Sequence, residues 1–421
     1  MLPGCTGRQS GTGGQSAGNS TQLSVITPHG REIQAEFERA FKAKHPDATI
    51  KWVSLEGGSA DTLRFVQDQF KGKDKAQGIN IDVFFGGGGE TFLDLEKDGF
   101  LQPLPSDYGI PANLNGVPLR GTNNQWVAAA LSGFGILVNK GIVTRDKLPY
   151  PAVWADMGNA KLINRIQLAD PRHSGSAHAA YEIILQSNGW EKGWQILTTM
   201  AGNARSFVSS SSTLVENVQN GEAVMAPAID FYARTAIARA GQDASGTAKL
   251  AYVEPRGQLV VTADPIGILR GAPRQQLARD FVELVLSPEG QKLWMYKKGA
   301  PGGPTQNELG RMAASPALFK SPSADAAFRS NPYAARNTHP YDSKKAAVRR
   351  RALDDLIGAV LIDNHDAVKA HWFKTRDAAR LTFVPVTEAE LTTLSAKWGD
   401  PAVQSAKVAE WGKEARAHFS K

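Results

Sequence analysis

Apolar runs alternate with amphipathic stretches over the first hundred residues of the chain. The runs short enough to be strands lie at residues 23–26, 49–53 and 81–85. Apolar side chains recur at helical spacing within residues 33–41, 61–70 and 90–98. Strands that alternate with helices predict a parallel α/β sheet, in which ligands bind beyond the carboxyl ends of the strands. The loops 27–30 and 86–90 follow two of these strands, so they are candidate binding loops.

A second block with the same alternation follows, and a helical segment follows that block. Its apolar patterns predict strands at 126–138, 165–169, 221–226, 259–264 and 266–269. Helices are predicted at 177–187, 190–200 and 277–285. Ser287-Pro288-Glu289 opens a further helix, because it supplies an N-cap, a proline at the first helical position and an early acid. Beyond Gly299 the chain is loop-rich, and it is then helical over 346–371 and 387–418.

Composition and charge restrict the class of protein. An apolar share of 42% with 21% charged residues excludes disordered, collagen-like and coiled-coil chains. No apolar run approaches the roughly 18 residues of a membrane span. The net charge of +7 is spread, with basic and acidic residues interleaved, so we expect no nucleic-acid partner. The one tight basic run, Arg349-Arg350-Arg351, is interpreted as a solvated helix face.

The single cysteine, Cys5, excludes an intrachain disulfide and a cysteine-built zinc site. Residues 6–21 are rich in Gly, Ser, Thr, Gln and Asn, so residues 1–21 are predicted to form a flexible tether. Leu2-Pro3-Gly4-Cys5 resembles the end of a bacterial lipoprotein signal, whose earlier regions are absent here, so we expect a trimmed or misassigned start. A lipid anchor through Cys5 is the hypothesis, and an incidental cysteine is the alternative.

Several short stretches, weak singly and specific in their order, resemble one family. They are residues 27–29, 82–88, 130–139, 170–176, 229–232, 264–268 and 287–294. Together they resemble the two-lobed extracellular solute-binding proteins of bacterial ABC importers, in the group of ferric-ion, phosphonate, polyamine and thiamine binders. The resemblance implies an α/β fold of the type II periplasmic-binding-protein kind with a C-terminal helical extension. It also implies a monomer that captures a small molecule and presents it to an ABC permease at the periplasmic or outer face of a bacterial membrane.

The same resemblance divides the chain into lobes. Lobe one comprises residues 22–130 and 265–320, and lobe two comprises residues 131–264. Residues 321–421 are expected to be a helical extension packed on lobe one. Ligand would bind in the cleft between the lobes, which close about a hinge.

Ser174-Gly175-Ser176 is the leading candidate for ligand contact. It lies between a predicted strand and a predicted helix, where backbone N–H groups carry partial positive charge. Two hydroxyls beside a glycine allow close approach of an anion such as a phosphonate or sugar phosphate. The ordinary alternative is an N-cap, which needs one serine. Arg205, in a polar loop of lobe two with Ser209–Ser212, is the expected counter-charge.

Other candidates come from strand ends and from the expected lobe crossing. They are Thr27, His29, Gly87, Gly88, Ser132, Asp230 and Tyr232. Arg234 is an alternative partner that would neutralise Asp230. In the ferric binders that this chain resembles, two adjacent tyrosines hold iron, but here Phe231 replaces the first and cannot be a ligand. Ferric iron as cargo, held by His29 and Tyr232 with Glu90 as an additional candidate ligand, is therefore the alternative to an anion.

Catalysis finds little support in the sequence. The chain has no Gly-x-Ser-x-Gly elbow, P-loop, His-Glu-x-x-His or dinucleotide-binding fingerprint. We therefore expect no enzyme and no cofactor. Two other classes stay open, which are a ligand-sensing module that docks on a receptor and an enzyme built on the same two-lobed scaffold.

Overall fold

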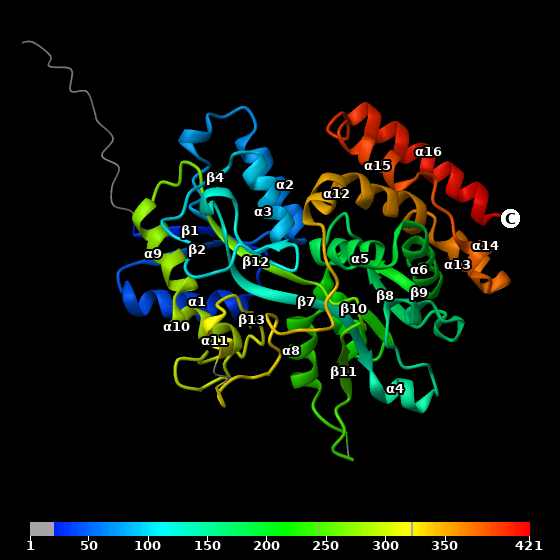
Figure 1. The fold of residues 1–421 in the computed structure, drawn as a ribbon, viewed down its shortest axis with the longest axis horizontal. Helices are drawn as coiled ribbons and strands as arrows, with labels where there is room; N and C mark the ends of the chain where they lie inside the picture. Colours follow the sequence, from blue (N-terminus) through cyan, green and yellow to red (C-terminus); the bar gives the residue numbers. More distant parts are fainter. Residues whose placement is uncertain (1–20, 244, 321–322) are drawn as a thin grey trace, which may run out of the picture.

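Two α/β lobes lie side by side in the computed structural model, which describes residues 21–243, 245–320 and 323–421 (Figure 1). The predicted tether and Cys5 lie outside the described residues, apart from Thr21. Two long strands, β7 (Val127–Asn139) and β12 (Val261–Leu269), join the lobes. The first half of β7 pairs antiparallel with β12, and its second half pairs with strands of lobe two. The resulting sheet has the order β2-β1-β3-β12-β7-β10-β8-β9.

Lobe one is built on the three parallel strands that the sequence predicts. Its strands are β1 (Gln22–Ile26), β2 (Thr49–Val53), β3 (Val83–Phe85) and the short β4 (Leu101–Gln102) and β13 (Met312–Ala313). Its helices are α1 (Arg31–Lys44), α2 (Ser59–Phe70), α3 (Gly89–Lys97), α9 (Gln275–Leu286), α10 (Pro288–Met295) and α11 (Ala317–Lys320). Aromatic side chains fill the core, where Phe37 and Phe85 pack against Trp294. A small hairpin, β5 (Asn113–Leu114) with β6 (Val117–Pro118), precedes β7.

Lobe two forms the other half of the sheet. Its strands are β8 (Ile166–Ala169), β9 (Ala204–Val208), β10 (Met225–Ile229) and β11 (Leu250–Val253). Its helices are α4 (Lys140–Arg145), α5 (Gly175–Asn188), α6 (Trp190–Asn203), α7 (Ser211–Gln219) and α8 (Asp230–Ala240). Short 3₁₀ turns occupy Trp154–Gly158 and Ala160–Leu162 in this lobe, and Lys75–Gln77 and Thr122–Asn124 in lobe one. The strands predicted at 259–264 and 266–269 are one strand, β12, whose register shifts between Asp264 and Pro265.

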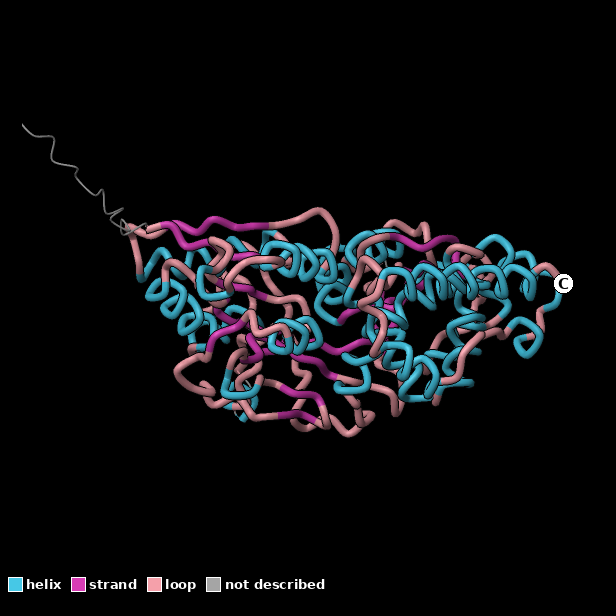
Figure 2. The backbone as a smooth tube through the Cα atoms, turned by 90° about the horizontal axis from the view of Figure 1, so that it is seen from above, coloured by secondary structure: helices cyan, strands magenta, loops and turns pink. Residues whose placement is uncertain are grey.

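The C-terminal segment is helical from Ser343 onward, and the predicted packing on lobe one is wrong for these helices, while residues 326–335 do pack on lobe one. It comprises α12 (Ser343–Ile357), a π-helical turn (Gly358–Ile362), α13 (His365–Thr375), α14 (Ala378–Leu381), α15 (Glu388–Ser395) and α16 (Pro401–Phe419). Leu353, Trp372 and Trp411 belong to the core of lobe two. The helices α13 and α14 pack on α6 of lobe two. The helix α12 contacts α5 of lobe two and also α3 of lobe one. Figure 2 shows these helices at the end of the molecule away from β1 and β2.

The physical reason lies in α6, which is buried along most of its length. Its last eleven residues from Gly193 to Asn203 are buried except Gln195. A helix that is buried on every side needs cover on more than one face, and the C-terminal helices supply it. The interpretation of residues 349–351 as a solvated face is also wrong, because Arg349 and Arg350 are buried and only Arg351 is exposed.

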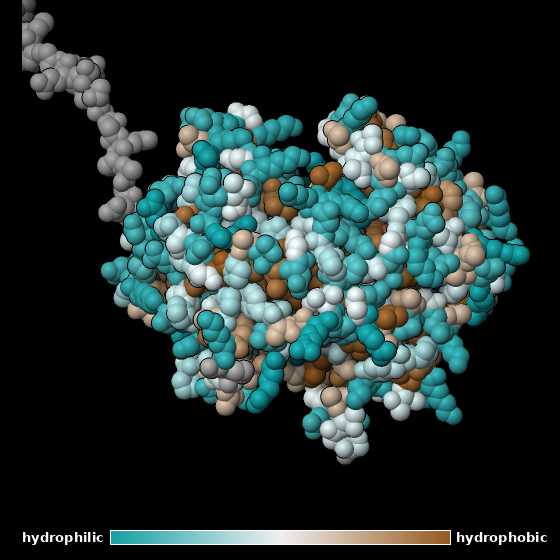
Figure 3. Space-filling view, viewed as in Figure 1, coloured by the Kyte–Doolittle hydropathy of each residue, from teal (hydrophilic) through white to brown (hydrophobic). Residues whose placement is uncertain are grey.

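The visible surface is mostly hydrophilic, with apolar side chains along the junction of the two lobes (Figure 3). None of the helices in the described part of the chain is long and apolar enough to cross a membrane.

Candidate functional site: the cleft between the lobes

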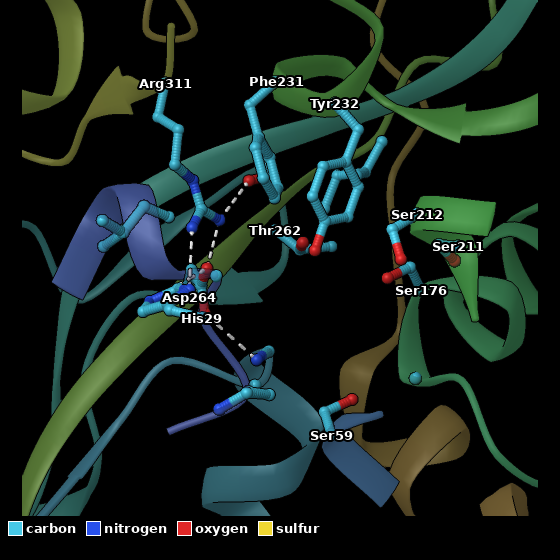
Figure 4. Close-up of a pocket in the computed structure, with 18 of the residues that line it drawn as sticks. His29, Ser59, Ser176, Ser211, Ser212, Phe231, Tyr232, Thr262, Asp264 and Arg311 are labelled. Carbon is cyan, nitrogen blue, oxygen red and sulfur yellow. Dashed lines mark hydrogen bonds and ion pairs between the residues drawn. The ribbon is translucent and has the colours of Figure 1, made fainter. Parts of the chain in front are cut away.

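A cleft of about 1020 Å³ lies between the lobes and is lined by both lobes and by the C-terminal segment (Figure 4). Most of the candidate residues from the sequence line it. These are His29, Gly87, Gly88, Ser132, Ser174, Gly175, Ser176 and Tyr232. Thr27, Arg205 and Asp230 do not line the cleft.

Helices from both lobes begin in the cleft. In lobe two, Ser174 caps α5 by accepting a hydrogen bond from the Ala177 N–H, and Ser210 caps α7 in the same way from Thr213. The hydroxyls of Ser174 and Ser211 lie 2.9 Å apart and join the two helix starts. In lobe one, α2 begins at Ser59, which also lines the cleft. The N-cap alternative therefore holds for Ser174, while Ser176 faces the cleft (Figure 4).

Backbone donors are left over at these helix starts. The N–H groups of Gly175, Ser176, Ser211 and Ser212 have no acceptor among the described residues. Because such groups carry the positive end of the helix dipole, they favour a negatively charged ligand group. The sequence placed Ser209–Ser212 in a polar loop, so it missed α7 as a second helix start. The serine run itself was the available signal, since serine is a preferred N-cap.

The two lobes touch at one edge of the cleft. A Cβ atom on Gly58 of lobe one would lie 2.3 Å from the backbone oxygen of His173 of lobe two. A Cβ atom on Gly175 would lie 2.2 Å from Oγ of Ser59. Nearby, Nη1 of Arg64 donates to the backbone oxygen of Arg172 at 3.3 Å. At Gly58 the clash would be with backbone, so glycine is required there for the lobes to approach this closely, whereas at Gly175 the Ser59 side chain could rotate away.

Arg311 holds the junction of the lobes together. Its buried guanidinium forms an ion pair with Asp264 of β12 and donates to Oγ of Ser132 of β7 at 2.9 Å. The guanidinium carbon also lies 3.9 Å from the ring centroid of Phe231, so the two side chains form a cation–π interaction. Sequence analysis missed Arg311 because it is far from its partners along the chain.

His29 lies beside this pair and is neutral at physiological pH. Burial lowers its pKa to about 4, an effect that Asp264 opposes and Arg311 reinforces. Its Nδ1 atom lies 3.4 Å from Nη1 of Arg311, and its Nε2 atom lies 3.9 Å from Asp264. The ring nitrogens therefore serve the hinge cluster of His29, Asp264, Arg311 and Ser132.

Tyr232 supplies a free donor. Its side chain points into the cleft near Thr262 (Figure 4), and its hydroxyl has no hydrogen bond to a described residue. Burial raises the pKa of the phenol, so the hydroxyl stays protonated. The side chain is suited to donate a hydrogen bond to an anionic or hydroxylated ligand.

Three predicted site residues have structural roles. The prediction that Arg205 supplies the counter-charge is corrected, because Arg205 lies on the edge strand β9 and forms an ion pair at 3.7 Å with the exposed Glu222. Asp230 is buried against Arg234 at 3.0 Å, as the alternative interpretation expected. Thr27 donates to the backbone oxygen of Phe85 at 2.6 Å and so fixes the loop that carries His29.

A buried charge cluster connects both lobes and the C-terminal segment. Glu90 at the start of α3 lies 2.9 Å from Nε2 of His178 on α5, and Asp354 on α12 lies 2.6 Å from Nδ1. Burial lowers the pKa of His178, but the two carboxylates outweigh it and raise the pKa to about 10. Burial raises the pKa of Glu90, but His178 outweighs it and lowers the pKa to about 2. His178 and Glu90 are therefore both charged at neutral pH, while burial raises the pKa of Asp354.

The free energy of unfolding is expected to depend on His178 at alkaline pH. Because the folded pKa is raised from 6.5 to about 10, this stabilisation is full below pH 6.5 and is lost as the pH rises toward 10. His178→Gln should therefore destabilise most at pH 6.5, with a gap to wild type that narrows by pH 9.5 in urea unfolding curves. His173→Gln, at an exposed histidine, is the control. A gap for His178→Gln that stays constant with pH would contradict the assignment.

The donor set of the cleft does not favour iron. Within the described ranges, no group of three or more His, Cys, Asp or Glu side chains is placed to hold a metal ion. The ring nitrogens of His29 face Arg311 and Asp264, and the Arg311 cation would repel a ferric ion. The raised pKa of Tyr232 opposes the phenolate that iron needs. Ferric iron as cargo stays an untested alternative prediction.

Known proteins resemble this chain in sequence and in fold. Phosphoglycerate transport regulatory protein PgtC of Salmonella typhimurium is 27% identical over 405 residues, which is 93% of each chain. The periplasmic binding protein AfuA of Actinobacillus pleuropneumoniae, solved with fructose-6-phosphate bound, has a TM-score of 0.63 at 19% identity and covers 84% of this chain and 98% of its own. Iron-bound HitA of Pseudomonas aeruginosa has a TM-score of 0.59 at 18% identity, covering 80% and 99%.

These likenesses confirm the predicted fold of the type II periplasmic-binding-protein kind. Residues 80–329, more than half of the chain, match the family described as bacterial extracellular solute-binding protein. Together with the two-lobed fold and the cleft, this match confirms the resemblance drawn from the sequence. The chain belongs to the bacterial extracellular solute-binding protein family, and it is a solute-binding protein of the ABC-importer type.

Proposed function

We propose that this protein captures a small phosphorylated organic anion, of the phosphoglycerate or sugar-phosphate class, and presents it to an ABC permease. The observation that carries the proposal is the convergence of the α2, α5 and α7 starts on one cleft. The leftover backbone N–H groups of α5 and α7 can each donate to a phosphate oxygen. A phosphate monoester offers three strong acceptor oxygens, which suits such a set of donors.

The rest of the cleft suits the remainder of such a solute. The hydroxyls of Ser59, Ser212, Tyr232 and Thr262 border it from both lobes (Figure 4). They can exchange hydrogen bonds with the hydroxyl or carboxylate groups of a glycerate or a sugar. A volume of about 1020 Å³ lies at the upper end of the range of small-molecule sites, so it accommodates a hexose phosphate.

Two relatives support this class of ligand by what their names state. PgtC, which matches over nearly the whole length, is named for phosphoglycerate transport. AfuA, which is similar in fold, was solved with fructose-6-phosphate bound. HitA was solved with iron, which is why iron belongs in the test.

A thermal-shift panel tests the proposal. It contains 3-phosphoglycerate, fructose 6-phosphate, D-glycerate and ferric citrate. Because a ligand that binds the folded state raises the melting temperature, we expect a shift with a phosphorylated probe and none with D-glycerate. A shift with ferric citrate alone, with a visible phenolate-to-iron band, would contradict the proposal and favour the iron alternative.

Ser176→Asp is expected to weaken binding of the phosphorylated probe by about 10-fold or more, because a carboxylate at the α5 start repels the anion and competes for its N–H donors. Isothermal titration calorimetry measures the change. Ser405→Asp, at an exposed position of α16, adds the same charge far from the cleft and should leave affinity within about 2-fold. Equal affinities of the two variants for the probe would show that the start of α5 does not bind the phosphate group.

A sensing role is the second candidate. The observation that favours it is that PgtC, which matches 93% of this chain, is named a transport regulatory protein. The same closed complex would then dock on a membrane receptor instead of a permease. Deletion of the gene decides between them: loss of solute uptake with unchanged transporter expression supports import, and loss of transporter induction supports sensing.

Membership of the family bears on where the protein acts. Members of this extracellular family act outside the cytoplasmic membrane, which agrees with the predicted periplasmic location. The lipid anchor through Cys5, the monomeric state and the absence of catalysis stay predictions.

A further inference from the structure

Four arginine side chains line the cleft in the described part of the chain, and three of them are neutralised. Arg234 lies 3.0 Å from Asp230, Arg239 lies 3.3 Å from Glu32, and Arg311 is paired with Asp264. The fourth, Arg350 on α12, has no carboxylate within 3.5 Å. Among these four, its guanidinium is therefore the one that makes no close ion pair.

The contacts of Arg350 leave most of its donors free. Its Nη1 atom makes one long hydrogen bond, at 3.4 Å, to Oγ1 of Thr91, and lies 3.8 Å from Asp94. Its Nε and Nη2 atoms have no hydrogen bond to a described residue. The residue is nevertheless only 5% exposed, so the guanidinium is held inside the cleft wall and not in solvent. A buried guanidinium with unused donors calls for an anionic partner.

The neighbours of Arg350 in the sequence show that this state is specific to it. Arg349 is also buried, but it is fully paired, with contacts of 3.0 and 2.7 Å to Glu182 and a further contact to Glu388. Arg351 is exposed. One basic run thus contains a structural arginine, a cleft arginine and a surface arginine, which together provide an internal control.

The guanidinium of Arg350 lies at the anion-binding end of the cleft. A Cβ atom on Gly175, the first residue of α5, would lie 3.4 Å from Nη2 of Arg350. The same Cβ atom would lie 2.2 Å from Oγ of Ser59 at the start of α2. Arg350, the α5 start and the α2 start therefore meet at one point.

Other charged groups near Arg350 are already engaged. Glu90 on α3 and Asp354 on α12 are both paired with His178 on α5. Asp94 on α3 remains, at the long distance of 3.8 Å. None of these carboxylates hydrogen-bonds to Arg350, so what remains for a further anionic group is the free Nε and Nη2 donors of the guanidinium and not an excess of positive charge.

We propose that Arg350, supplied by the C-terminal segment, is the counter-charge that binds the phosphate group of the solute at the start of α5. This inference rests on the proposed function and specifies which residue of that site selects a dianionic phosphate ester over a carboxylate. The planar guanidinium can hold two phosphate oxygens at once, which favours phosphate geometry. The C-terminal segment, which the sequence predicted to pack on lobe one, then forms a third wall of the binding site.

Isothermal titration with 3-phosphoglycerate and fructose 6-phosphate tests this on the wild type, Arg350→Gln, Arg350→Lys and Arg351→Gln. We expect Arg350→Gln to weaken binding of the tighter probe about 10-fold or more, and Arg351→Gln to change it less than about 2-fold. Arg350→Lys retains the positive charge but cannot donate two parallel hydrogen bonds to the phosphate, so we expect an intermediate loss of affinity. Thermal melts without probe report whether each variant folds.

A second readout separates charge recognition from a packing role. The phosphate group gains its second charge near pH 6, so wild-type affinity should rise from pH 5 to pH 7. Arg350→Gln should flatten that rise, whereas a packing defect would lower affinity equally at both values. If Arg350→Gln does not fold, Arg350→Lys at wild-type affinity overturns the inference.

The outcomes also separate this inference from the proposed function. If wild-type protein binds neither phosphorylated probe, the proposed function fails and the inference fails with it. If wild type binds a probe and Arg350→Gln matches Arg351→Gln, the inference alone is wrong.

Discussion

Gly58→Ala is expected to weaken capture of the phosphorylated solute about 100-fold. The added Cβ atom would lie 2.3 Å from the backbone oxygen of His173, so the lobes could not close to the observed distance. Overpacking of this kind costs about 1–3 kcal/mol, and here a backbone atom must move, which places the cost near the upper end. Because the clash arises only when the lobes meet, it penalises the closed state and leaves each lobe intact.

Calorimetry measures the affinity of Gly58→Ala, and thermal melts without ligand measure its stability. Alanine is tolerated by the backbone at this position, where φ is −109°. A small loss of stability is expected, because alanine is a poorer N-cap than glycine. Gly399→Ala, which meets nothing within 4 Å, is the matched control. Unchanged affinity in Gly58→Ala would show that the solute binds without this closure.

Asp264→Ala is expected to lower the free energy of unfolding by about 3–5 kcal/mol, because it leaves the buried charge of Arg311 without its partner. The matched control is Glu222→Ala, which breaks the exposed ion pair with Arg205 and should cost no more than about 1 kcal/mol. Urea unfolding at pH 7 measures both. Equal losses in the two variants would mean that the hinge cluster is not a stabilising unit.

The pH dependence of Asp264 gives an independent check on the same pair. Burial raises the pKa of Asp264, but Arg311 and His29 outweigh it and hold the pKa below 3.8. A depressed carboxyl pKa stabilises the fold at higher pH, and this contribution is lost as the pH falls below 3.8. The gap between wild type and Asp264→Ala should therefore shrink in acid.

The lobes could be predicted from the sequence because their signals are local. Strand–helix alternation near residues 23–98 and the cap at Ser287 depend on short-range periodicity and on preferences at helix ends. The start of α5 was found for the same reason, since a strand followed by Ser174-Gly175-Ser176 is a local pattern. The closeness of Ser174 to Ser211 requires the three-dimensional arrangement of two helices.

The remaining site residues depend on contacts between distant segments. Arg311, in the loop before β13, meets Asp264 of β12 and Ser132 of β7, and no periodicity along the chain records that meeting. The C-terminal helices pack on lobe two because α6 is buried on all sides, which is a property of tertiary packing. The role of Arg350 could not be predicted from the sequence for a related reason. Three consecutive arginines look alike in the sequence, but they have three different environments in the structure.

The central claim is that an anion binds to the backbone N–H groups where α5 and α7 begin. Titration of ¹⁵N-labelled protein with 3-phosphoglycerate, followed by amide resonances, tests it most directly. We predict that the amide signals of Gly175, Ser176, Ser211 and Ser212 move more than those of any helix start outside the cleft. Binding with these four signals unmoved would contradict the account.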